Sequence, residues 1–237
     1  MLVCAGFLIP FLWMISTSLK TLDRVMSDQP QFIPDPIAWE NYRKVLTHPS
    51  VHFLLFARNF FRHPRMLGSL VPSSRFLIRQ LLRPIDWTSA RVIVEYGPGV
   101  GVITDEILKR MSPDAVLVAI EMNPEFVEFL RASLPDPRLH VVQGSAESVQ
   151  EILKSLGQPK ANYIISGIPF STIDRRLRER ILRRTSAVLA PGGAFLVYQF
   201  STRVLPDLQR IFLYVRRQFA PLNVLPAHLF FCQPGRA

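Results

Sequence analysis

Cysteine is nearly absent from this sequence of 237 residues, which contains only Cys4 and Cys232. The two lie at opposite ends of the chain, each within an apolar run, and they have no metal-ligand spacing. They exclude a disulfide framework and a cysteine-based metal site, and they suit a reducing compartment. Neither is a good candidate for a nucleophile. The sequence also lacks internal repeats and low-complexity tracts.

Acidic residues are scarce as well. There are 18 Asp and Glu residues against 28 Lys and Arg residues, which gives a formal net charge of +10. The first 50 residues hold four charges of each sign, so the whole excess falls on residues 51–237. A basic domain is attracted to RNA or to an anionic membrane surface, and charge alone does not choose between these partners.

A long hydrophobic run is also lacking. Residues 2–16 are almost wholly apolar, but even when extended to Leu19 the run falls slightly short of the roughly 20 residues that cross a bilayer. It has neither the basic n-region nor the small-residue cleavage site of a signal peptide. A short anchor over residues 2–19 is one interpretation. Lys20 and Arg24 would then place the following domain at the cytoplasmic face of the membrane.

The segments PFLWMISTSLKTLDRV and FIPDPIAWENYRKVL closely resemble the first membrane helix and adjoining loop of sugar ABC-transporter permeases, over residues 1 to 47. The further membrane helices and the coupling loop of a permease are missing, so transport is not supported. We predict that residues 1–50 form a hydrophobic helix and linker without a catalytic role. They are expected to be a membrane anchor, or the product of a gene fusion or a misassigned start.

Residues 51–67 have the pattern of an amphipathic helix at the start of a domain spanning residues 51–237. Its apolar side and its basic side are well separated, apart from Leu55. One interpretation is a helix that covers the domain core, and the other is a helix lying in a membrane interface. The apolar side carries Phe53, Phe56, Ala57 and Phe60, and the opposite side carries Arg58, Arg62 and Arg65.

From residue 92 onward, strand and helix patterns alternate, which indicates a parallel sheet with right-handed crossovers. The sequence predicts an α/β fold with a Rossmann-like, mostly parallel sheet of seven strands flanked by helices. The expected strands are residues 92–94, 115–120, 139–142, 163–165, 194–200, 218–224 and 228–232. The expected helices are residues 75–82, 123–134, 148–156, 174–189 and 206–212, the fourth of them stopped by Pro191-Gly192-Gly193.

The first of these strands runs into the pattern E-x-G-x-G-x-G, formed by Glu95, Gly97, Gly99 and Gly101. Glycines allow positive φ and let a ligand lie against the backbone. In dinucleotide-binding proteins the third glycine comes three residues after the second, whereas here it comes two residues after. The spacing therefore counts against NAD, the alternative cofactor. The pattern resembles motif I of class I S-adenosylmethionine (SAM) methyltransferases.

Two more strand ends carry groups that suit SAM, since ligands of open α/β sheets lie past the carboxyl ends of the strands. Glu121 follows the second strand, where a carboxylate can accept hydrogen bonds from both ribose hydroxyls, and Met122 can pack against adenine. Ser145 and Ala146 follow the third strand. Methyltransferases often carry an acidic residue there that binds the adenine amino group, and Ser145 is the weaker substitute.

The fourth strand is followed by Ser166-Gly167-Ile168-Pro169-Phe170, at the position of motif IV. In amino-methylating enzymes this motif reads N/D-P-P-Y or N-L-P-Y, and it holds the target nitrogen while an aromatic ring stacks on the base. Ser166 replaces Asn or Asp here, which weakens the case for adenine. We expect the carbonyl groups of Gly167 and Ile168 to orient an amine. The alternative is a plain strand-to-helix turn.

Together, FFRHPRMLGSLVPSS, VEYGPGVGVIT, AIEMNPEF, ISGIPFS and APGGAFLVYQFS resemble the bacterial phospholipid N-methyltransferases, over about residues 53–232. That group methylates phosphatidylethanolamine, and related members methylate ornithine lipids. It is itself similar to the rRNA adenine dimethyltransferases, whose Gln-Asn before motif I corresponds to Pro72-Ser73 here. The resemblance implies SAM as cofactor, with Ser73 among its contacts, and direct SN2 transfer without a metal. A lipid ammonium must first lose a proton, for which Tyr198 and His228 are the candidates.

A helix with six arginines follows motif IV, and it is either a solvated face or a surface for lipid phosphates or an RNA backbone. The leading hypothesis is a monomeric, SAM-dependent N-methyltransferase that acts on a lipid head group at an anionic membrane surface. An rRNA adenine N6-methyltransferase is the alternative enzyme, and a membrane-tethered SAM-fold binding module is the alternative without activity. The six arginines are Arg175, Arg176, Arg178, Arg180, Arg183 and Arg184.

Overall fold

The computed structural model describes residues 16–20, 33–41, 75–220 and 226–235. The chain divides into two compact units, Met1–Asn59 and Phe60–Ala237. The expected helix over 51–67, the expected boundary at residue 50, Ser73 and most of the expected anchor lie outside the described residues. Within the described residues, no helix has the length and apolar character needed to span a bilayer.

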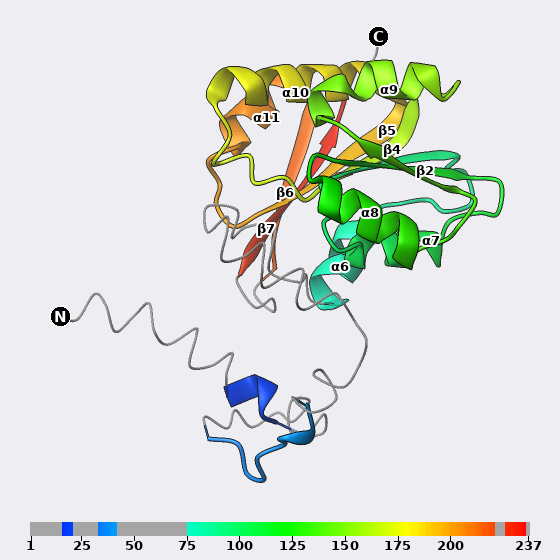
Figure 1. Cartoon of the computed structure of the whole chain (residues 1–237). Helices are drawn as coiled ribbons and strands as arrows, with labels where there is room; N and C mark the ends of the chain where they lie inside the picture. The colour runs from blue at the N-terminus through cyan, green and yellow to red at the C-terminus, as the bar shows by residue number, and fades with distance from the viewer. Residues whose placement is uncertain (1–15, 21–32, 42–74, 221–225, 236–237) are drawn as a thin grey trace. The chain divides into compact units, whose positions relative to one another are not determined.

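The second unit is built on a sheet of seven strands in the order β3-β2-β1-β4-β5-β7-β6 (Figure 1). All strands are parallel except β7, which is antiparallel to both β5 and β6. This confirms the predicted Rossmann-like, mostly parallel sheet. The strands are β1 (Val92–Tyr96), β2 (Val116–Glu121), β3 (Leu139–Gln143), β4 (Ala161–Ser166), β5 (Leu189–Gln199), β6 (Tyr214–Ala220) and β7 (Ala227–Gln233).

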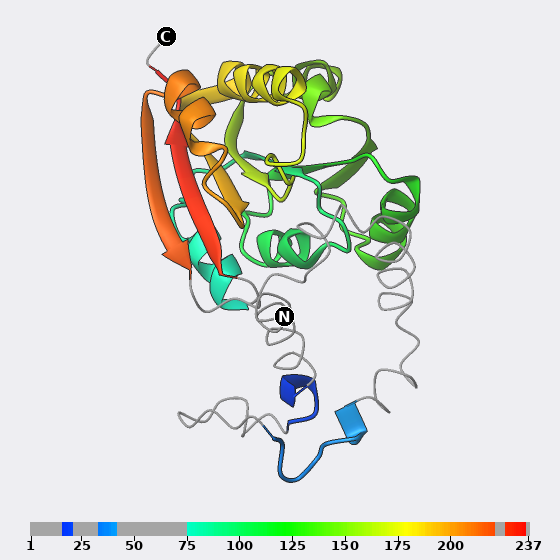
Figure 2. The same ribbon diagram turned by 90° about the vertical axis from the view of Figure 1, so that its left-hand side faces the viewer.

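Helices cover both faces of this sheet, as the two views show (Figures 1 and 2). One face packs against α9 (Val149–Ser155), α10 (Arg175–Val188) and α11 (Leu205–Ile211). The other face packs against α6 (Arg75–Leu82) and α7 (Val102–Leu108), with α8 (Pro124–Ser133) beside β2 and β3. A short 3-10 helix, η2 (Ala146–Ser148), precedes α9. The central strands are buried on both faces, which explains their nearly continuous apolar sequences.

Local capping signals start two of these helices where the sequence predicts. The Asn123 side chain accepts a hydrogen bond from Glu125 N at 2.9 Å, and Pro124 occupies the first turn of α8. Asp174 caps α10 in the same way, because its Oδ1 accepts from Arg176 N at 2.9 Å. Both caps satisfy backbone N–H groups that lack partners within the helix.

The expected start of the fifth strand is wrong. β5 begins at Leu189 rather than Ala194, because Leu189 pairs with Ala161 before the register shifts and Ala194 pairs with Tyr163. The Pro-Gly-Gly segment is therefore an irregularity inside the strand. Gly193 is required there, since a Cβ would lie 2.7 Å from Asn162 O. The sixth strand is also displaced: it starts at Tyr214, opposite Gln233 of a longer β7, and ends at Ala220.

Candidate active site

The glycine loop after β1 adopts the backbone conformation that its sequence predicts. Gly97, Gly99 and Gly101 have φ angles of 66°, 57° and 81°, in the region that residues with a Cβ rarely adopt. The loop is fixed to the sheet by Gly97 N, which donates to Ile120 O at 2.9 Å. A Cβ on Gly101 would lie 2.7 Å from Leu130 Cδ2, so a side chain at this position would force the Leu130 side chain of α8 to shift.

Glu95 lies beneath the loop rather than in it. Its side chain is buried, and its Oε2 accepts a hydrogen bond from Thr104 Oγ1 at 2.7 Å. Burial raises the pKa of Glu95 to about 7, and the nearby charge of Glu121 adds to the effect. The carboxyl group therefore joins β1 to α7 and supports the loop from below.

Glu121 connects the loop to the end of β2. Its Oε2 accepts from Gly99 N at 3.2 Å, and its Oε1 accepts from Asn123 N at 2.9 Å. Burial raises the pKa of this carboxyl group, although these backbone N–H groups act in the opposite direction. Met122, the next residue, has 71% of its surface exposed. An acidic side chain and an exposed apolar one thus stand together at this strand end.

The end of β3 lies next to the end of β2, because Gly144 N donates to Glu121 O at 2.9 Å. Ser145 Oγ accepts from Glu147 N at 3.1 Å and begins η2, while Ala146 is buried. The structure therefore brings the expected cofactor residues of the first three strands to one edge of the sheet. Ser73 is the expected residue that falls outside the described ranges.

The loop Ser166–Phe170 contacts the glycine loop directly. Gly167 N donates to Tyr96 O at 3.0 Å, and a Cβ on Gly167 would lie 3.2 Å from both Gly97 O and Tyr198 Oη. Ser166 is fully buried, and its Oγ accepts from Ile168 N at 3.3 Å. The glycine loop is expected to bind the cofactor, and the loop Ser166–Phe170 is expected to bind the methyl acceptor and is called the acceptor loop below. The two loops are thus held within van der Waals distance of each other.

Phe170 is fully buried and makes an edge-to-face contact with Phe195, at 6.3 Å between ring centroids. Its carbonyl accepts from Arg178 Nη1 at 3.0 Å. The expected stacking of this ring on a substrate needs an exposed face, and Phe170 offers none here. Its sequence signal, an aromatic residue after a strand, is shared by core residues, and the structure places the ring in the core.

Gln199, at the end of β5, is a site residue that the sequence analysis missed. It is buried, and its Nε2 donates to Ile168 O and to Tyr198 O, both at 2.7 Å. The signal that marks it is an amide side chain at the carboxyl end of an otherwise apolar strand. Its partner Ile168 lies 31 positions earlier, so the contact itself has no local pattern.

The two candidate bases face opposite sides of the sheet. Tyr198 is buried on the face of α6 and α7, with its Oη beside Gly167. His228 pairs with Gln199 across β5 and β7, and its ring lies 5.2 Å from that of Phe219. Burial, followed by the charge of Arg217, lowers the pKa of His228. Its Nδ1 is buried and has no hydrogen-bond partner among the described residues.

The family model for ribosomal RNA adenine dimethylases matches residues 65–191. The chain belongs to this methyltransferase family. An ornithine lipid N-methyltransferase of Singulisphaera acidiphila is 35% identical over 189 residues, covering 76% of this chain and 95% of that protein. A ribosomal RNA small subunit methyltransferase A of Mycoplasma mycoides is 28% identical over 96 residues. That match covers 40% of this chain and 35% of the relative.

Solved methyltransferase structures share the fold. A methyltransferase of Geobacter sulfurreducens has a TM-score of 0.52 at 15% identity, covering 81% of this chain and 95% of that structure. The precorrin-6y C5,15-methyltransferase of Geobacter metallireducens has a TM-score of 0.53 at 15% identity, covering 67% and 88%. The protein is therefore a class I methyltransferase, and its cofactor is S-adenosyl-L-methionine, as the glycine spacing predicts.

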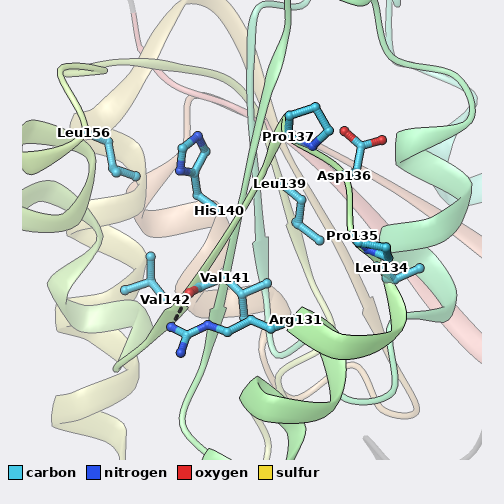
Figure 3. Close-up of a pocket in the computed structure, with 10 residues that line it drawn as sticks. All are labelled: Arg131, Leu134, Pro135, Asp136, Pro137, Leu139, His140, Val141, Val142 and Leu156. Atoms are coloured by element: carbon cyan, nitrogen blue, oxygen red, sulfur yellow. Dashed lines mark hydrogen bonds between the residues drawn. The ribbon is translucent and has the colours of Figure 1, made fainter.

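A hollow of about 530 Å³ in this methyltransferase lies elsewhere, along the outer edge of β3 (Figure 3). It contains none of the candidate site residues. Across this hollow, Arg131 Nη2 donates a hydrogen bond to Val141 O at 2.8 Å. The bond satisfies a backbone carbonyl group on the edge of β3 that faces away from β2. Within the ranges that the structure describes, no group of three or more His, Cys, Asp or Glu residues is arranged to hold a metal ion.

Three arginines of the arginine-rich helix pair with acidic residues of neighbouring elements. Arg178 binds Asp207 of α11 at 2.8 Å, Arg180 binds Glu147 of η2 at 2.6 Å and Arg184 binds Glu151 of α9 at 2.9 Å. These ion pairs hold α10 against the helices on either side of it. The structure therefore gives three of the six arginines a role within the fold.

Proposed function

We propose that this methyltransferase transfers methyl groups from SAM to the amine of a membrane lipid head group. The observation that carries the proposal is the match to an ornithine lipid N-methyltransferase over 95% of its length. The proposed acceptors are phosphatidylethanolamine or an ornithine lipid. The reaction takes place at the cytoplasmic face of the membrane, with residues 51–67 lying in the interface and residues 2–19 as a further anchor.

The cofactor residues receive their roles from this proposal. SAM lies over the loop of Gly97, Gly99 and Gly101, and the Glu121 carboxylate accepts from its ribose hydroxyls. Glu95 acts indirectly, by supporting the loop through Thr104. Met122, Ser145, Ala146 and Ser73 complete the binding site, the first three around the adenine ring.

Methyl transfer proceeds by in-line displacement. The lone pair of the acceptor nitrogen forms the new N–C bond while the S–C bond of SAM breaks, leaving S-adenosylhomocysteine. Alignment of nitrogen, methyl carbon and sulfur supplies most of the acceleration, and the contact between the two loops favours that alignment. The acceptor ammonium must lose a proton first, and Tyr198 and His228 remain the candidates for receiving it.

A second candidate function is N6-methylation of adenine in rRNA. The family match and the net charge of +10 favour it. The match spans about a third of the length of the M. mycoides rRNA methyltransferase, however. With Pro169-Phe170 aligned to the last two residues of the adenine-methylating motif, Gly167, rather than the expected Ser166, stands where that motif has Asn or Asp, and it offers no side-chain oxygen. Both features support the lipid acceptor over the RNA acceptor.

Incubation of the protein with methyl-labelled SAM and either total lipid or total RNA tests the proposal. We expect label in a lipid amine, and binding to anionic liposomes in a flotation assay. Label in RNA alone, with tight and salt-sensitive RNA binding, would instead support the second function. Failure to bind SAM in calorimetry would contradict both.

A further inference from the structure

The acceptor loop is held by a side chain from another strand. Gln199 has 4% of its surface exposed, and its amide nitrogen donates to Ile168 O and Tyr198 O, both at 2.7 Å. An amide NH₂ group has two hydrogens, so both are used. Gln199 thereby fixes the distance between the end of β5 and the loop after β4.

This contact changes which carbonyl group of the loop can receive a substrate. Ile168 O accepts from Gln199 and also from Phe170 N at 2.9 Å, so both of its lone pairs are occupied. Among the described residues, no donor to Gly167 O is found. Gly167 is itself a buried residue and lies beside the glycine loop, since a Cβ there would approach Gly97 O to 3.2 Å.

We propose that Gln199 is a positioning residue for the methyl acceptor. By occupying Ile168 O, it makes Gly167 O the backbone acceptor that binds the substrate amine and sets the angle of its lone pair toward the methyl group. This inference rests on the proposed transfer to an amine, lipid or otherwise. It revises the sequence expectation that both carbonyl groups act together.

Two variants separate donation from packing. Gln199→Met keeps most of the volume and removes both donors. Gln199→Glu keeps the shape, but its carboxylate faces two carbonyl oxygens. We expect kcat with the labelled acceptor fraction to fall about 10-fold in the Met variant and about 100-fold in the Glu variant, since a displacement of about 1 Å in a reacting geometry costs up to about 100-fold. The dissociation constant for SAM should stay within about twofold, since no cofactor residue is changed.

The relative loss of turnover in the two variants distinguishes a donor role of Gln199 from a packing role. A packing role predicts that the isosteric Glu variant is the milder one, whereas a donor role predicts that it is the more severe. Gln218→Met on β6, two strands away, is the matched control and should retain wild-type turnover. Unchanged turnover in both variants, a milder Glu variant, or loss of SAM binding in both would overturn the proposal. If wild-type protein labels RNA and not lipid, the proposed lipid function fails while the same comparison, made on RNA, still tests Gln199.

Discussion

The two halves of the sheet differ in how their loops are held. In the half proposed to bind the cofactor, β1 to β3, the glycines give the loop its conformation, and the Glu121 carboxylate of β2 accepts from Gly99 N and Asn123 N. In the acceptor half, β4 to β7, the loop is fixed by side chains from other elements, namely Gln199 of β5 and Arg178 of α10. A glycine spacing that can be read from the sequence therefore marks the first half, whereas the second half has no such spacing and its loop depends on side chains of β5 and α10.

The largest expected effect tests the cofactor half. Glu121→Ala removes the carboxylate that holds Gly99 N and Asn123 N and that is proposed to bind the ribose. Hydrogen bonds to a charged group contribute about 1.5 to 3 kcal/mol each, so SAM affinity should fall at least about 100-fold in calorimetry. Glu128→Ala, at an exposed position of α8, is the matched control and should bind SAM normally. Unchanged affinity in the Glu121 variant would refute the ribose role.

The fold was readable from the sequence because its signals are local. Asn123-Pro124 and Asp174 cap α8 and α10, and apolar runs mark the strands. The errors arose where pairing overrides a local pattern. Pro191-Gly192-Gly193 has the composition of a helix stop, but β4 supplies Ala161 as a partner for Leu189 and so extends β5 backwards.

The positions of part of the candidate site could also be predicted. Gly97, Gly99, Gly101 and Glu121 follow from spacing, and the structure brings them together. The positions of Phe170 and Gln199 could not be predicted in this way. One aromatic ring or one amide after a strand has no spacing that distinguishes substrate contact from core packing. Their environments depend on Phe195 and Ile168, which are distant in the sequence.

An effect of similar size should appear in the pH dependence of stability. Burial raises the pKa of Glu95 from 4.5 to about 7, so the folded state binds the proton more tightly than the unfolded state. Below about pH 4.5 the group is protonated in both states and has no effect. As pH rises from 4.5 to 7 the folded state loses stability, on the order of 3 kcal/mol, and the loss is complete above pH 7.

Glu95→Gln removes this titration while keeping the shape of the side chain. In thermal unfolding without SAM, the stability of the variant relative to wild type should be higher at pH 8 than at pH 5. Thr104→Val should move the window to higher pH, because the hydrogen bond from Thr104 lowers the pKa of Glu95. A variant whose advantage is the same at both pH values would show that Glu95 does not titrate in this range.

The smallest expected effects test the acceptor half through two arginines of α10. The Arg178–Asp207 pair is mostly buried, with 14% and 10% of the side chains exposed, and Arg178 also binds Phe170 O. Arg183 pairs with Glu179 within the same helix, and 62% of the Arg183 side chain is exposed. Removing one partner of a buried pair leaves an uncompensated charge, whereas an exposed pair contributes little.

In urea unfolding, Arg178→Ala should lower the free energy of unfolding by about 2 kcal/mol. The loss is smaller than for a buried pair without other partners, because Arg210 remains 3.1 Å from Asp207. Arg183→Ala should cost less than about 0.5 kcal/mol. Since Arg178 anchors the carbonyl group of Phe170, its variant should also lower turnover more than SAM affinity, which the Arg183 variant should not do. Equal costs for the two arginines, or a loss of SAM affinity as large as the loss of turnover, would contradict the view that tertiary contacts of α10 set the acceptor loop independently of the cofactor half.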